Sequence, residues 1–260
     1  MKHILYEELC PGEFAERIRE FPAAFLPLGT LEWHGYHMPL GADGLQAQGA
    51  MRMIAERVGG IVLPMLFLGP DLAIETDGGL KCGMDIHSFE TGCAQQLAGS
   101  AYYIEDARFD ELLDCTMRNL ARAGFRIVVA HGHGPSTNAF AAHEQEYLEK
   151  YGLRCFTLFD LGYTGYDGLM TDHAAANETS ITMALHPDLV HPEYLTEDRI
   201  PVASWGRDPR RYASSEFGWK LMNQNVDRAA GQLEVMKAEV RGEAPTLEYH
   251  NVANKIEPER

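Results

Sequence analysis

The stretch Leu26–Asp43 reads LPLGTLEWHGYHMPLGAD, and the rest of the chain is organised around it. It continues an apolar run that predicts a buried strand over residues 23–28, and it ends in a loop rich in Gly and Pro. Its last twelve residues gather four potential metal ligands: Glu32, His34, His37 and Asp43. Glu32 and His34 are two residues apart, so on an extended strand edge their side chains would point the same way.

One Glu or His near a strand end is usually a solvated or hydrogen-bonded residue. Four together beside an apolar strand are different, because burying several ionisable groups is costly unless something pairs them. A bound metal ion would pair them, so the stretch favours a metal site.

Residues Glu32–Asp43 resemble the Glu-x-His-Gly-x-His-Leu-Pro-x-x-x-Asp signature of the creatininase (creatinine amidohydrolase) family. Two weaker motifs follow in the expected order. His131-Gly132-His133-Gly134 is similar to the family's Asn-Gly-His-Gly-Gly-Asn, and the stretch His173–Ser180 resembles its His-Ala-Gly-x-x-Glu-Thr-Ser. The resemblance runs from Phe25 to Leu185, and the residues after it carry no matching motif.

This resemblance implies two divalent ions per chain. Glu32, Asp43 and His133 would hold one ion, His34, Asp43 and Glu178 the other, with Asp43 bridging. A hydroxide held between the ions would attack an amide carbonyl. His173 and Glu178 would line the active site as catalytic residues, with His173 passing a proton to the leaving nitrogen. Nitrogen and oxygen ligands suit zinc, manganese or iron; the resemblance implies Zn²⁺, with Mn²⁺ or Fe²⁺ at the more exchangeable position.

The chain departs from the family pattern at two places. His131 replaces the first Asn of the second motif, and Pro135 stands where creatininase itself has a metal-binding glutamate. Glu178 is the candidate for the missing carboxylate. His131, His37 and Tyr36 are expected to touch substrate or to orient the ligands, with packed structural roles as the alternative. Tyr163 and Tyr166 join Tyr36 as candidate walls for a planar substrate.

The expected activity is metal-dependent hydrolysis of a non-peptide, often cyclic, amide C–N bond in a small molecule. One alternative keeps the metal site but acts as a lactonase, isomerase or carbon–carbon hydrolase on a sugar-derived carbonyl compound. Another is a non-catalytic metal-binding protein.

Length and composition predict one α/β domain over residues 1–260, with 45% hydrophobic and 23% charged residues. A net charge of −16 argues against nucleic acid or an anionic membrane as partner. The acidic N-terminus and the lack of long apolar runs predict a cytoplasmic protein. The five scattered cysteines indicate neither a disulfide framework nor a thiolate zinc site. The family resemblance implies a homo-oligomer, with a hexamer as the expected form.

Alternating patterns predict a mostly parallel sheet in a three-layer α/β/α domain. Further strands are expected over 61–68, 126–130 and 155–159. Helices are expected over 11–20, after Asp43 as far as Val58, over 108–123, after Asn138 as far as Lys150, over 174–185 and over 214–241. Residues 71–100 lack periodicity and are expected to form a functional loop or a subunit contact, with His87 and Glu90 as possible substrate contacts.

Overall fold

The computed structural model describes residues 3–85, 102–197 and 202–240. Its strands are β1 (Ala23–Leu28), β2 (Ile61–Val62), β3 (Ala73–Thr76), β4 (Gly79–Cys82), β5 (Ile127–Gly132) and β6 (Arg154–Thr157). Its α-helices are α1 (Pro11–Glu20), α2 (Ala42–Val58), α3 (Asp106–Ala123), α4 (Gly134–Ala142), α5 (Glu144–Tyr151), α6 (Leu158–Leu161), α7 (Ala176–Leu185), α8 (Pro209–Tyr212) and α9 (Ser215–Val240).

The central sheet is parallel, with the strand order β2-β1-β5-β6. Strands β1 and β5 lie in the middle and pair along their whole length, from Ala23 opposite Ile127 to Leu28 opposite Gly132. Their carboxyl ends therefore stop side by side, which is where open α/β sheets place their sites.

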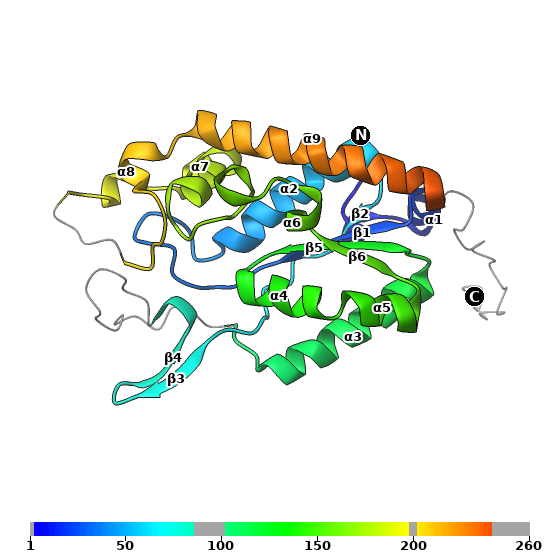
Figure 1. The fold of residues 1–260 in the computed structure, drawn as a ribbon, viewed down its shortest axis with the longest axis horizontal. Helices are drawn as coiled ribbons and strands as arrows, with labels where there is room; N and C mark the ends of the chain where they lie inside the picture. Colours follow the sequence, from blue (N-terminus) through cyan, green and yellow to red (C-terminus); the bar gives the residue numbers. More distant parts are fainter. Residues whose placement is uncertain (1–2, 86–101, 198–201, 241–260) are drawn as a thin grey trace, which may run out of the picture.

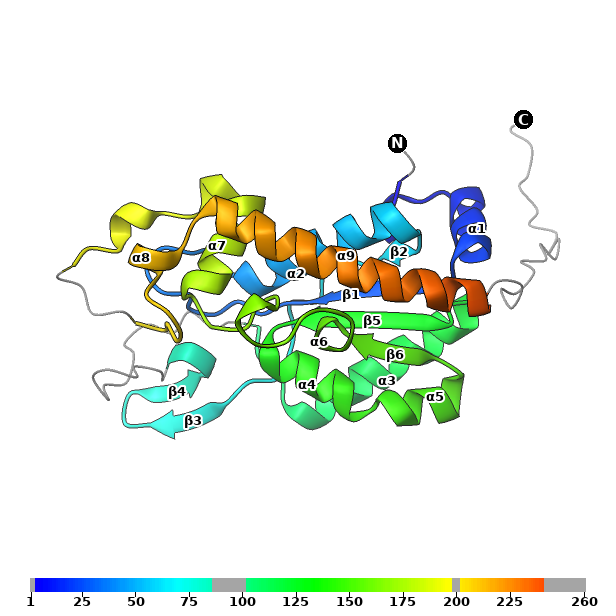
Figure 2. The same ribbon diagram turned by 45° about the horizontal axis from the view of Figure 1, so that its top comes forward.

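Both faces of the sheet are covered, so the predicted three-layer α/β/α architecture is confirmed (Figure 1 and Figure 2). Alternate residues of β1 serve opposite faces: Phe25 packs toward α2, α7 and α9, while Leu26 packs toward α3, α4 and α5. Burial on both faces explains why β1 and β5 read as continuous apolar runs without alternation.

The expected strand β1 and helix α1 have the predicted bounds. However, β1 ends at Leu28, so Glu32 and His34 lie in the following loop and the expectation that they share a strand edge is wrong. Helix α2 begins at Ala42, close to its predicted start after Asp43, so Asp43 lies in its first turn and not just before it. Gly44 and Gly49 of this helix pack closely against Met65 and Leu185.

Other expected elements are shorter or divided. The strand predicted over 61–68 is regular only at β2, and the helix predicted to reach Lys150 breaks at His143 into α4 and α5. The stretch expected to be irregular from Asp71 contains the antiparallel hairpin β3–β4. His87 and Glu90 lie outside the described residues. Within the described residues, no helix combines the length and apolar character that crossing a membrane requires.

Candidate metal centre

Five buried ionisable side chains meet at the carboxyl ends of β1 and β5. Glu32 and His34 come from the loop after β1, and Asp43 comes from the first turn of α2. His133 follows β5 and precedes α4, and Glu178 lies in the first turn of α7. Both helix N-termini favour the negative charge of the carboxylate that they carry.

Two groups of ligand atoms lie close enough together to share an ion. Glu32, Asp43 and His133 form one group, His34, Asp43 and Glu178 form the other, and within each group the atoms are within 4.8 Å of one another. All five side chains are at most 4% exposed. Three carboxylates buried this closely require compensating positive charge, so the donor set fits two divalent cations.

Each of the two histidines in these groups turns one nitrogen to the carboxylates and the other to a backbone carbonyl. His34 Nε2 lies 3.0 Å from Asp43 Oδ1 and 3.7 Å from Glu178 Oε2. On the other side of the ring, Nδ1–H donates to Glu32 O over 3.2 Å. Donation to a carbonyl fixes the tautomer of the ring and leaves Nε2 available to an ion.

His133 has the same arrangement with its nitrogens exchanged. Its Nδ1 lies 3.1 Å from Asp43 Oδ2 and 3.2 Å from Glu32 Oε1, while Nε2–H donates to Pro70 O over 3.2 Å. Gly132, at φ +146°, makes the turn that delivers this ring; a Cβ there would lie 1.6 Å from Leu28 O.

Without ions, the imidazoles themselves balance the carboxylates. Burial lowers the pKa of His34, but the charges of Asp43, Glu178 and Glu32 outweigh burial and raise that pKa to about 10. The pKa of His133 is raised well above its ordinary value because Glu32 and Asp43 outweigh burial. Burial and the charge of Asp43 raise the pKa of Glu178, whereas His34 and His133 hold the pKa of Asp43 well below its usual range.

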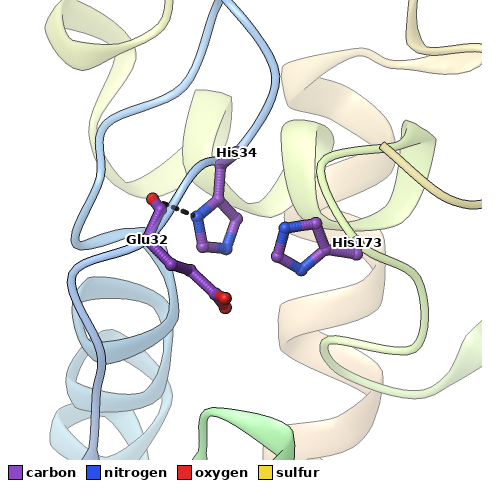
Figure 3. A group of neighbouring side chains, drawn as sticks. All are labelled: Glu32, His34 and His173. Atoms are coloured by element: carbon purple, nitrogen blue, oxygen red, sulfur yellow. Dashed lines mark hydrogen bonds between the residues drawn. The ribbon is translucent and has the colours of Figure 1, made fainter. Parts of the chain in front are cut away.

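His173 lies directly beside this centre, as Figure 3 shows with Glu32 and His34. Its ring stacks on that of His34 with 4.2 Å between centroids, and its Nε2–H donates to Trp33 O over 2.7 Å. Burial, followed by the positive charge of His34, lowers the pKa of His173 to about 4. His173 also forms a third group of potential ligands with Glu32 and His34.

A cavity of about 820 Å³ opens over the centre. It is lined by Glu32, Asp43, His133, His173 and Glu178 and by further residues that include Phe159, Tyr166, Trp205 and Arg207. The cavity is large enough for a small organic molecule.

Three of the residues expected to contact substrate or to orient ligands, His37, His131 and Tyr36, lie outside the cavity lining. His37 is buried, with its Nε2 2.8 Å from Thr179 Oγ1, and His131 is buried with Phe159 edge-on at 4.4 Å. Tyr36 lies edge-on to Trp33 at the margin of a separate, smaller pocket. Of the other two tyrosines, Tyr166 lines the cavity and Tyr163 does not.

Sequence reasoning missed Asp71, which also lines the cavity. Its Oδ2 lies 3.5 Å from His133 Nε2 and has no hydrogen-bond partner among the described residues. Burial and the charge of Glu32 raise the pKa of Asp71 to about 6. The sequence signal that could have identified Asp71 is its position directly after the apolar run that ends at Pro70. That position places it at the same edge of the sheet as the other candidate ligands.

Comparison with known proteins gives consistent matches along the chain. The family model described as Creatininase, creatinine amidohydrolase, matches residues 7–232. A creatinine amidohydrolase of Pseudomonas putida is 26% identical over 212 residues, covering 73% of this chain and 74% of that protein.

Two solved structures show the same fold. A crystal structure of creatinine amidohydrolase superimposes with a TM-score of 0.69 at 23% identity, covering 91% of this chain and 98% of the other. A mutant creatininase of the zinc–zinc type gives a TM-score of 0.64 at 23% identity, covering 95% of this chain and 100% of the other.

The family model spans most of the sequence, and the fold agrees with it. This chain therefore belongs to the creatininase family of metal-dependent amidohydrolases.

Proposed function

We propose that the five-residue centre is a two-ion site that hydrolyses a non-peptide amide C–N bond of a small molecule. Glu32, Asp43 and His133 would hold one ion, and His34, Asp43 and Glu178 the other. The observation that carries this proposal is the pair of buried ligand groups that share Asp43 at the floor of one cavity.

Zinc is the first candidate for both positions, because the donors are nitrogen and oxygen and a neighbouring structure is of the zinc–zinc type. Manganese and iron suit the same donors. When bound, such ions supply an activated water and polarise the carbonyl oxygen of a substrate.

Residues of the chain itself would complete the metal site and transfer the proton. Glu178 supplies the carboxylate that Pro135 cannot, because its Oε2 is held 2.8 Å from Ala174 N and 3.7 Å from His34 Nε2. His173 would carry the proton to the leaving nitrogen. Its Nε2–H is engaged by Trp33 O, and its lowered pKa keeps the ring neutral, so Nδ1 is the available base.

The test combines metal analysis with a substrate screen. Protein purified without chelator is expected to hold close to two divalent ions per chain, and to hydrolyse lactams or formamides in preference to lactones. Glu32→Gln and Asp43→Asn should lose both metal and activity while remaining folded. Asp77→Asn, at the exposed turn between β3 and β4, is the matched control.

Full activity of folded Glu32→Gln and Asp43→Asn proteins would refute the proposal. Turnover confined to lactones or keto-sugars would instead support the alternative chemistry on the same site.

We further propose that the chain forms a homo-oligomer through the β3–β4 hairpin. The hairpin stands away from the body of the molecule (Figure 1) and exposes Leu72, Ile74 and Leu80. Light scattering of the wild type and of an Ile74→Lys, Leu80→Lys variant tests this. A wild-type monomer, or an unchanged assembly of the variant, would contradict the proposal.

A further inference from the structure

The segment of residues 202–208 forms one wall of the cavity and is bonded to the residues that build the centre. Trp205 and His173 exchange two backbone hydrogen bonds, of 2.7 and 2.8 Å. Arg207 O accepts from Ala176 N over 2.9 Å, at the start of α7. Ser204 Oγ–H donates to Ala174 O over 3.1 Å. We call this segment the 202–208 wall.

The wall is also closely packed against the residues just before α7. A Cβ at Gly206, where φ is +138°, would lie 2.6 Å from Asp172 Cβ and 2.8 Å from Ala175 Cβ. Only glycine allows the backbone to pass this close. The side chains on either side of Gly206 are therefore carried by a backbone whose position is fixed relative to His173 and Glu178.

Those two side chains, Trp205 and Arg207, line the cavity and remain exposed. Trp205 is 56% exposed, although a large aromatic ring on a rigid backbone is well suited to bury its face against a ligand. Because the wall positions the ring next to His173, a planar molecule lying on it would reach the centre.

Among the described residues that line this cavity, Arg207 is the one lysine or arginine, and the lining carboxylates are those of Glu32, Asp43, Asp71, Asp172 and Glu178. Its guanidinium lies over the ring of Tyr166 at 4.0 Å, and Tyr166 in turn stacks on Phe217 at 5.6 Å. No carboxylate of the described residues forms an ion pair with Arg207. The guanidinium is therefore oriented by Tyr166, and no carboxylate of the described residues competes with a ligand for its remaining donors.

We propose that the substrate of this chain carries an anionic group, such as a carboxylate, which Arg207 binds while Trp205 supports the plane of the amide. The inference rests on the proposed function, since it names the substrate class of the same site. Two divalent ions and the Arg207 guanidinium carry five positive charges, which equal the negative charges of the five lining carboxylates. Because the cavity then has no net positive charge, an anionic substrate needs the specific contact that Arg207 provides.

The chain offers a matched control for this role. Arg228 lies over the ring of Tyr163 at 4.9 Å, so it makes the same kind of stack, but neither residue lines the cavity. If Arg207 served only to stack on a tyrosine, Arg207→Gln and Arg228→Gln would have similar consequences.

The experiment measures binding of two pairs of cyclic amides that differ by a carboxylate: dihydroorotate with dihydrouracil, and hydantoin-5-acetate with hydantoin. Calorimetry uses the metal-loaded full chain in a His173→Gln background, which slows turnover. We expect an anionic member to bind about tenfold or more tightly than its neutral partner, the size of one charge-assisted contact. Arg207→Gln should abolish that preference, and Arg228→Gln should retain it.

Equal or absent binding of the anionic members, or a preference that survives Arg207→Gln, would overturn the inference. Hydrolysis of the four compounds by the wild-type protein is measured separately. If the protein hydrolyses the neutral and anionic compounds equally well, Arg207 does not recognise the substrate, and the proposed function still holds. Absence of amide hydrolysis by fully metal-loaded protein, with Arg207-dependent binding retained, would instead count against the proposed function alone.

Discussion

At the scale of single residues, His34 and His133 hold protons where ions would bind. In each ring the nitrogen that faces the carboxylates is protonated in the metal-free protein, because acidic neighbours raise both pKa values. A cation must displace those protons before it can bind.

Metal binding is therefore expected to release about two protons at pH 7, one from each imidazole, with a further contribution from Glu178. Metal affinity should fall as the pH is lowered. Calorimetric titration with zinc in buffers of different ionisation enthalpy measures the proton count. A count of zero would mean that His34 and His133 are neutral before metal binds.

His173 has two roles open to it, and one variant separates them. If it carries a proton, His173→Gln should lower kcat by roughly 10²–10⁴-fold and leave the metal content unchanged. If it is a ligand within the third group, the same variant should lose metal. Elemental analysis beside steady-state kinetics distinguishes the two, with His191→Gln, at an exposed histidine paired with Glu193, as the control.

Asp71 should make the stability of the metal-free protein depend on pH. Burial raises its pKa to about 6, above the ordinary 3.8, so the folded state binds its proton more tightly than the unfolded state. Its contribution to the free energy of unfolding is therefore present below about pH 4 and is lost as the pH rises through 6.

Asp71→Asn should remove this dependence and stabilise the metal-free protein by about 1–2 kcal/mol at pH 8, a figure reduced for partial exposure. Thermal unfolding from pH 4 to pH 8, with Asp77→Asn as control, tests this. A less stable Asp71→Asn protein at pH 8 would show that the carboxylate is held by His133.

At the scale of elements, the turn from β5 into α4 has almost no tolerance for a side chain at Gly132. Gly132→Ala should cost several kcal/mol, because its Cβ would meet Leu28 O in the neighbouring central strand. Gly134→Ala, two residues on, meets nothing within 4 Å and should change stability little. Denaturant unfolding compares the two, and equal stabilities would contradict this account of the turn.

The sequence predicted the bounds of an element correctly where its apolar pattern continues to both ends of that element. The strand β1 and the helix α1 were predicted with their bounds for this reason. Helix α2 was predicted to follow Asp43 and begins at Ala42, so the prediction differs only in leaving Asp43 outside the helix. The β3–β4 hairpin was missed because its residues are mostly exposed, so neither strand shows the alternation that burial imposes.

The candidate site likewise contains residues that the sequence predicted and residues that it did not. The motifs identified the five side chains that meet at the centre, although their binding of metal stays a prediction. Trp205 and Arg207 could not be predicted, because the segment that carries them has no periodicity and reaches the cavity only through tertiary contacts. Asp71 was missed although it directly follows an apolar run.

At the scale of the whole molecule, the centre joins the loop after β1 with α2, β5 and α7. Bound ions would favour only the folded arrangement, so a chelator should lower the melting temperature. At ions a hundredfold above Kd, the expected stabilisation is about 2.7 kcal/mol, or roughly 5–11 °C for a chain of this size. Scanning calorimetry with and without EDTA measures it, and an unchanged melting temperature would mean that no ion is bound.

The five side chains of the centre are spread along the sequence from Glu32 to Glu178, and this spacing also affects the lifetime of the protein. Each ion would connect residues that are far apart in the sequence and so form a reversible cross-link between distant parts of the chain. A cell short of these ions would hold a larger fraction of chains open to proteases. We expect the abundance of this protein, and not only its specific activity, to follow the metal supply.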